Sequence, residues 1–166
     1  MHAAAVDLSF WISEIDSSVP ATALFVRKFG HPPPQHPHHL AAFHLGVDGV
    51  STLACYVHFW SFGDIVLGGG ACVDDRVLRR LDASQRERLR AQGGLYRLVL
   101  DYAVHKFSAG HSAIFGFCGD RRAEAVDRAA GFVSTEHAKL LVYWARDLHP
   151  LHQAALVAKA HALGPF

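Results

Sequence analysis

The chain has 166 residues, of which 51% are apolar and 19% are charged, a composition typical of a globular protein rather than a disordered or collagen-like one. Sixteen Lys and Arg residues against fifteen Asp and Glu residues give a formal net charge of +1, which does not favour a strongly electrostatic nucleic-acid binder. Cys55, Cys72 and Cys118 form neither a disulfide framework nor a CxxC zinc pattern, and their spacing favours a reducing, cytoplasmic setting.

The first part of the chain predicts a strand, a helix and a long loop. Residues 8–15 are short, apolar and aromatic, which predicts a strand, and the apolar spacing of residues 18–29 predicts a helix that ends at Gly30. The following segment, residues 31–39, holds four prolines. Because proline fixes φ and removes a backbone donor, this histidine-rich segment is expected to be an extended loop.

A β-hairpin is predicted next, because Asp48-Gly49 lies between the apolar segments 40–47 and 50–62. A two-residue turn at Asp48-Gly49 makes Phe43 face Ala54. Counted further outward in the same register, Ala41 faces Tyr56 and His39 faces His58.

A third strand of this sheet, residues 65–74, contains Gly68-Gly69-Gly70, which suggests a bulge or a backbone or ligand lying close. The charged segment 75–91 predicts a solvated helical insert that Ser84 would cap. Gly93-Gly94 then opens a long helix that ends at Gly110.

The last elements follow in the order strand, helix, strand pair and helix. They are expected at residues 113–117, 120–130, 132–135 with 140–145, and 151–163. The whole order predicts one α/β domain over residues 1–166, with a mixed, largely antiparallel sheet.

Three segments resemble motifs of the GCN5-related N-acetyltransferase (GNAT) superfamily, and the resemblance covers roughly residues 8–147. Residues 70–74 are similar to the family's fourth strand, and residues 90–96 are similar to its pyrophosphate loop. Residues 113–118, followed by a helix and Gly131-Phe132, are similar to its fifth strand and Gly-Phe junction. The resemblance implies a three-layer αβα fold with a twisted sheet. Relative to the family, residues 75–90 would form an insert after strand four and residues 151–163 an added helix.

The resemblance also implies an acyl-CoA co-substrate, acetyl-CoA or another acyl-CoA, and transfer of its acyl group to a primary amine. A glycine-rich turn that opens a helix presents free N–H groups to phosphate, which is consistent with that role. The residues expected to contact the co-substrate are Cys72, Val73, Arg90, Gly93, Gly94, Leu95, Tyr96 and Cys118.

The sequence also departs from the family pattern at the positions that carry acid–base chemistry. Leu95 stands where the loop motif prefers Gly or Ala, and Asp127 stands where the family has its general-acid Tyr. The strand positions of the usual Glu base read Leu67-Gly68-Gly69-Gly70. These departures keep open an alternative, a catalytically inactive GNAT-like ligand-binding or interaction module.

His58 is the candidate general base, because a neutral imidazole beside His39 can accept a proton. His39, Tyr56 and Trp60 would line the acceptor groove. The competing interpretation is that both histidines are partly buried spacers in their strands. Asp127 is a second catalytic candidate, although a solvated helix face is its default interpretation.

No native metal is expected at His36, His38 and His39, because histidines in a proline-locked segment cannot readily converge and no Cys or acidic residue lies near in the sequence. Cys118 is open to two interpretations, a covalent acyl-cysteine or a small core residue. The acceptor amine is a small molecule or a peptide, and aminoglycosides, polyamines, amino acids and protein N-termini all remain open. No membrane partner is expected, and the strand pair at residues 132–145 would support a homodimer.

Overall fold

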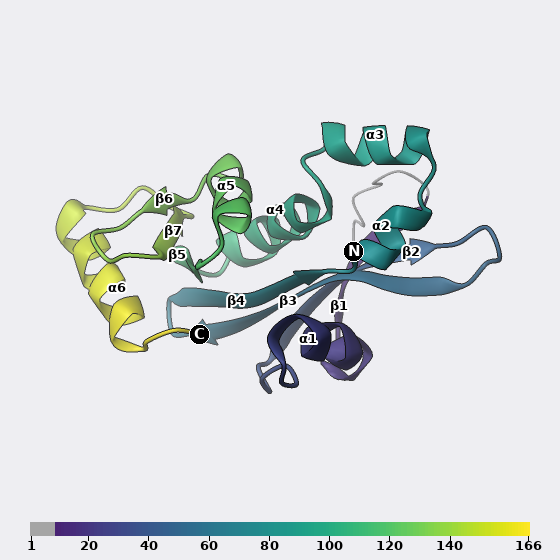
Figure 1. The fold of residues 1–166 in the computed structure, drawn as a ribbon. Coiled ribbons are helices and arrows are strands. Elements are labelled where there is room, and N and C mark those ends of the chain that lie inside the picture. Colours follow the sequence, from purple (N-terminus) through teal and green to yellow (C-terminus); the bar gives the residue numbers. More distant parts are fainter. Residues whose placement is uncertain (1–8) are drawn as a thin grey trace.

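The computed structural model describes residues 9–166, and a seven-stranded sheet forms its centre (Figure 1). The strand order is β1-β2-β3-β4-β5-β7-β6, and every neighbouring pair is antiparallel except β4 and β5. The expected mixed, largely antiparallel sheet is therefore confirmed; Leu8, at the start of the predicted first strand, lies outside the described residues. The strands are β1 (Phe10–Ile15), β2 (His38–Leu45), β3 (Ser51–Phe62), β4 (Ile65–Val73), β5 (Ala113–Phe117), β6 (Val133–Ser134) and β7 (Leu140–Trp144).

Helices cover both faces of the sheet and confirm the three-layer αβα arrangement (Figure 1). One face is covered by α1 (Thr22–Phe29) and by α6 (Pro150–Ala162), and the other face is covered by α4 (Leu95–Ser108) and α5 (Arg121–Ala129). The period of two along each strand divides the core: in β4, Val66 packs on the α4 side, whereas Ile65 and Leu67 pack on the α6 side.

The predicted insert forms two short helices, α2 (Asp75–Arg80) and α3 (Ala83–Ala91). The predicted cap at Ser84 is wrong, because Asp82 and Gln85 form a reciprocal capping box that starts α3 two residues earlier in the chain. Leu89 is the buried residue of α3. The remaining surface of α3 is polar, as expected for a solvated helix.

The β2–β3 hairpin corrects one prediction and confirms another. The amide of Gly46 donates to the Val50 carbonyl at 2.9 Å, so the turn is longer than Asp48-Gly49 and Phe43 faces Leu53 rather than Ala54. A register shift between Ala42 and Phe43 offsets this one-residue difference. Beyond that bulge the predicted pairs are observed, including His39 opposite His58.

The parallel pair β4–β5 opens partway along its length. Pairing runs from Ile65 with Ala113 to Gly68 with Gly116 and then stops, although β4 continues to Val73. Within residues 9–166, the β5-side edge of β4 therefore has no strand partner over its last residues, and β4 and β5 separate from this point.

Candidate functional site

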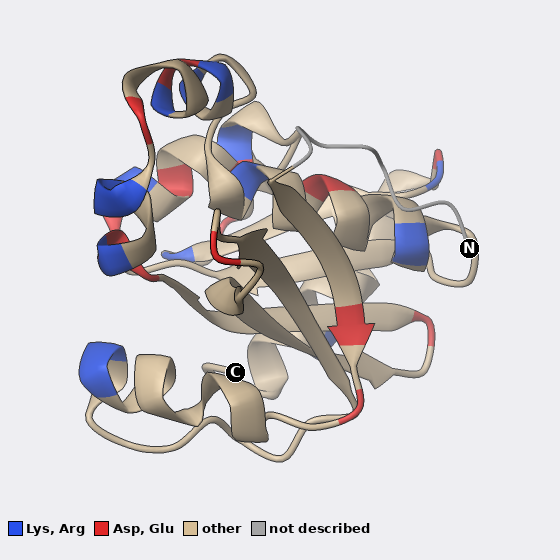
Figure 2. Cartoon of the chain, turned by 90° about the vertical axis from the view of Figure 1, so that its right-hand side faces the viewer, with Lys and Arg blue, Asp and Glu red and all other residues tan. Residues whose placement is uncertain are grey.

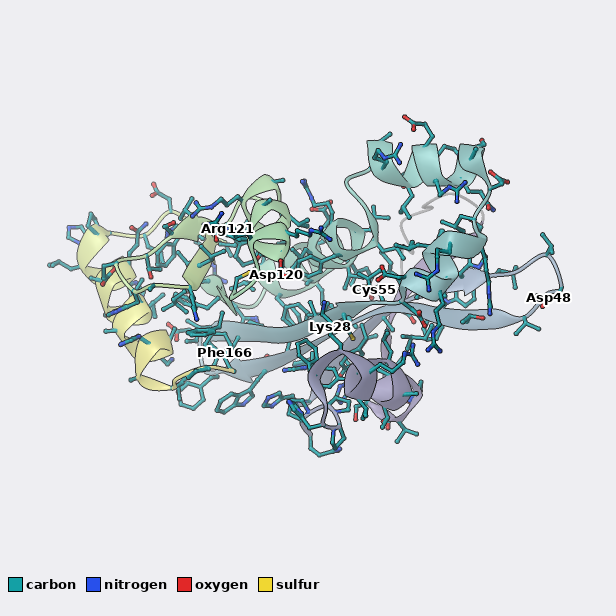
Figure 3. All side chains as sticks on the ribbon, in the orientation of Figure 1. Lys28, Asp48, Cys55, Asp120, Arg121 and Phe166 are labelled. Carbon is teal, nitrogen blue, oxygen red and sulfur yellow. The ribbon has the colours of Figure 1, made fainter. Side chains whose placement is uncertain are left out.

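A cavity of about 520 Å³ lies where β4 and β5 separate. Its walls come from β4, from the end of β5 with the turn that follows, and from both helical layers. The lining includes Gly68 to Val73, Gly116 to Asp120, Lys28 and Phe29 of α1, Tyr96 of α4, and Arg122 and Asp127 of α5. In Figure 3, Lys28 and Asp120 lie on opposite sides of the sheet at this opening.

Four of the residues expected to contact the co-substrate line the cavity: Cys72, Val73, Tyr96 and Cys118. Gly93 and Gly94 lie just before α4, with φ angles of 86° and 90°, a region that favours glycine. No side chain caps the helix at Gly94, and its first turn holds no acidic residue. The amino end of α4 therefore presents backbone N–H groups and a positive dipole end close to the cavity wall at Tyr96.

Leu95 and Arg90 take other positions. The Leu95 side chain is buried in the core between α4 and the sheet, so only its main chain is placed to meet a ligand. Arg90 is exposed on α3 and pairs with Glu87 at 2.8 Å. Neither side chain lines the cavity.

Asp127 and Tyr96 form a buried pair at the cavity wall. The Tyr96 hydroxyl donates to Asp127 Oδ1 at 2.6 Å, and Asp127 is only 4% exposed. The default expectation of a solvated Asp127 is therefore wrong, because α5 packs this face against α4. Burial raises the pKa of Asp127, and it also raises the pKa of Tyr96. Burial thus opposes the ionisation of Asp127, whereas the hydrogen bond from Tyr96 favours it.

Cys118 lies beside the same pair at the end of β5. Its Sγ atom lies 3.2 Å from the Asp120 carbonyl oxygen. Burial raises the pKa of the Cys118 thiol to about 11. Because the thiolate is the nucleophile, this thiol is a poor candidate for a covalent acyl-enzyme at neutral pH.

The candidate base lies on the other face of the sheet, on the side of α1. His58 is 3% exposed, and neither of its ring nitrogens has a hydrogen-bond partner within residues 9–166. Burial lowers the pKa of His58 to about 3, with further lowering from His36 and His39. The Tyr56 hydroxyl forms a hydrogen bond with Nδ1 of His39, and the two atoms lie 2.8 Å apart.

Repulsion between the two imidazoles was expected to lower their pKa values, but burial is the larger cause for both His58 and His39. His58 does not line the cavity; the main chain of β4 lies between them, where a Cβ at Gly70 would overlap the imidazole. Trp60 lies on the same face, stacked on His36 with ring centroids 5.7 Å apart.

The three candidate metal ligands of the proline-rich segment, His36, His38 and His39, have different partners. His36 stacks on Trp60, His38 bonds Glu14 at 2.7 Å, and His39 bonds Tyr56. Within the described part of the chain, no group of three or more His, Cys, Asp or Glu side chains is arranged to hold a metal ion.

We expect protein purified without a histidine tag or added metal to contain no stoichiometric metal. The reason is that each of these imidazoles faces a different partner, and metal ligands must converge on one point. Elemental analysis checks this. One tightly held zinc per chain would contradict it and would indicate a site built from His36, His38 and His39.

Two cavity residues were not found from the sequence. Lys28 and Arg122 bring positive charge to the cavity from α1 and α5. No sequence signal identifies them, because each belongs to an amphipathic helix whose polar positions look alike until the helices are placed.

Similarity to known proteins is found in structure rather than in sequence. No model of a known protein family matches the sequence, and no curated protein matches it. The ribosomal-protein-S18-alanine N-acetyltransferase from Escherichia coli superposes with a TM-score of 0.57 at 10% identity, covering 85% of this chain and 97% of that one. The ribosomal-protein-S5-alanine acetyltransferase from Vibrio fischeri gives a TM-score of 0.52 at 11% identity, covering 87% and 100%. AtaTR bound with acetyl-CoA gives 0.50 at 12% identity, covering 90% and 98%.

None of the helices within residues 9–166 combines the length and the apolar character that crossing a membrane requires.

Proposed function

Starting from the GNAT fold that the chain shares with these acetyltransferases, we propose that it transfers an acetyl group from acetyl-CoA to a primary amine. The observation that carries the proposal is the cavity at the β4–β5 opening, next to the uncapped amino end of α4. Acetyl-CoA is bound in the structural neighbour AtaTR.

The residues of the cavity fit an extended, phosphate-bearing thioester. The unpaired edge of β4 offers backbone groups to the amides of a pantetheine arm, with Val73 near the acyl carbonyl. The Gly93-Gly94 turn offers N–H groups to the pyrophosphate. Lys28 and Arg122 add cations that pair with phosphate.

Two proton movements accompany acyl transfer. The ammonium loses a proton before its nitrogen attacks, and the thiol sulfur gains one as the C–S bond breaks while the C–N bond forms. Asp127, whose pKa burial raises, is our candidate donor to the sulfur, and Tyr96 orients it. His58 is our candidate acceptor for the amine proton, with an ordered water as the alternative.

We expect acetyl-CoA to raise the melting temperature of the protein, because a ligand that binds the native state stabilises it. Gly94→Val should abolish this shift, since its side chain would obstruct the pyrophosphate site. Gly49→Val is the matched control, because Gly49 has a similar φ of 75° and lies in the β2–β3 turn, away from the cavity. No shift of the unmodified protein at millimolar acetyl-CoA would contradict the proposed function.

A second candidate function is a GNAT-like binding module without catalysis. It is favoured by the absence of any Asp or Glu from β4, whose Gly68-Gly69-Gly70 stands where a carboxylate base is usual in the family. A protein that binds acetyl-CoA but releases no free thiol with any amine would support this candidate.

A further inference from the structure

The insert at residues 75–90 carries the net positive charge of the chain. It holds six of the sixteen Lys and Arg residues and three of the fifteen Asp and Glu residues, so its formal net charge is +3. The rest of the chain holds ten basic and twelve acidic residues, which gives a net charge of −2. Figure 2 shows the basic residues of α3, the uppermost helix in that view, in blue. The excess of positive charge therefore lies on α2 and α3.

The acidic residues of the insert leave most of this charge unpaired. Asp82 caps α3, and Glu87 pairs with Arg90 at 2.8 Å. Among residues 9–166, no carboxylate forms an ion pair with four exposed arginines of the insert, which are Arg76, Arg79, Arg80 and Arg86. Arg76 and Arg80 are four residues apart on α2, a spacing at which like charges destabilise a helix. These guanidinium groups are available to an anionic partner.

The first turn of α2 borders the cavity. Asp75, the first residue of α2, lines the cavity two residues after Val73, which the proposed function places near the acyl carbonyl. Within the described part of the chain, Asp75 has no ion-pair partner. Arg79 follows Asp75 by four residues, and side chains with this spacing lie on the same face of a helix. A carboxylate at the cavity is thus followed by a guanidinium about 5.4 Å, one helical turn, further along α2.

The ligand that complements this order of charges has an ammonium followed by carboxylates. We propose that the acceptor is the amino terminus of an acidic peptide, whose ammonium enters the cavity past Asp75 and whose first acidic side chains pair with arginines of α2. This rests on the proposed function and specifies its acceptor. An extended chain advances about 3.3 Å per residue. A carboxylate on the second or third residue of the peptide therefore reaches Arg79 when the amino group lies at Asp75.

Arginine also binds phosphate, but two features of the insert favour a peptide over a nucleic acid. Residues 75–92 contain no Phe, Tyr, Trp or His side chain on which a base could stack. Asp82 and Glu87 lie among the arginines and would repel a phosphate backbone that follows them. In addition, an unmodified nucleic acid has no aliphatic primary amine to accept an acyl group, whereas a peptide amino terminus is one.

The test uses two peptides that differ only at the second and third residues, which are Asp and Glu in one and Asn and Gln in the other. Release of free CoA thiol is the readout. We expect kcat/KM to be about three- to tenfold higher for the acidic peptide, through a lower KM, because each exposed ion pair contributes up to about fivefold. The difference should nearly vanish in about 1 M salt, where the screening length falls to about 3 Å.

Substitutions of Arg79 connect this preference to α2. Arg79→Glu should reverse it, since the new carboxylate repels the acidic peptide, and Arg79→Lys should keep most of it. Arg146→Glu is the matched control, because this exposed arginine follows β7 at the end of the sheet where Trp144 pairs with Ala113, away from the cavity end of β5. The acetyl-CoA melting shift of each variant checks that its fold and cavity are intact.

Equal kcat/KM for the two peptides, no thiol release with either, or a preference that persists in Arg79→Glu would overturn the inference, while an intact melting shift left the proposed function standing. Loss of the melting shift in Arg79→Glu alone would overturn it as well, since the insert would then bind acetyl-CoA. Binding of poly(U) RNA that Arg79→Glu abolishes, with the two peptides reacting equally, would assign the surface to a nucleic acid. A missing melting shift in the unmodified protein would instead overturn the proposed function.

Discussion

His58→Gln should lower turnover by about 10²–10⁴-fold, the usual effect of losing a general base. The physical reason is that His58 holds the unpartnered ring nitrogen next to the Gly69 opening, whereas glutamine has no basic nitrogen. Affinity for acetyl-CoA should barely change, because His58 does not line the cavity that is proposed to hold it.

The matched control is His105→Gln, an exposed histidine of α4. Steady-state rates of thiol release measure turnover, and the acetyl-CoA melting shift measures affinity. Because burial lowers the pKa of His58 to about 3, His58 should not titrate between pH 5 and pH 8. Unchanged turnover in His58→Gln would leave an ordered water as the base.

Acid should destabilise the protein through the same residue. The unfolded chain binds a proton at His58 with a pKa near 6.5, whereas the folded chain does so only near pH 3. Stability is therefore fully present above pH 6.5 and is lost as the pH falls toward 3. At pH 4.5 the loss from His58 is about 3 kcal/mol, from 1.36 kcal/mol per pKa unit.

Urea denaturation at pH 7.0 and pH 4.5 gives the free energies of unfolding that check this. The loss between the two pH values should be about 3 kcal/mol smaller in His58→Gln than in the unmodified protein. Other groups, including Asp127 with its raised pKa and Glu14 with its lowered pKa, act in both proteins and cancel in the difference. Equal losses would show that His58 is not buried in its neutral form.

Most of the fold could be predicted because its elements are marked locally. The strand at residues 113–117 was predicted with the bounds observed, since turn residues flank its apolar run. The Asp48-Gly49 turn could not be predicted correctly. Its true length depends on the Gly46–Val50 bond, and the compensating bulge at Ala42 and Phe43 has no signature in the residues themselves.

The positions of candidate site residues could be predicted only where the pairing of two strands fixes them. Alternation along β2 and β3 placed His39 opposite His58, because strand pairing is a matter of counting. Asp127 could not be placed in the same way, because the spacing of a helix does not reveal which neighbour covers it. The contact of Phe166 with β4 joins residues that are almost a hundred positions apart in the chain, and no local pattern encodes it.

The bulge at Ala42 and Phe43 separates the hairpin tip from the histidine pair. Between the bulge and the tip, the turn sets how β2 pairs with β3. On the other side of the bulge, His39 lies opposite His58. The tip extends beyond the sheet, with Val47 fully exposed and Val50 half-exposed (Figure 1). The turn can therefore be lengthened, shortened or replaced by an epitope or a dye-binding sequence, and the rest of the sheet would keep its alignment.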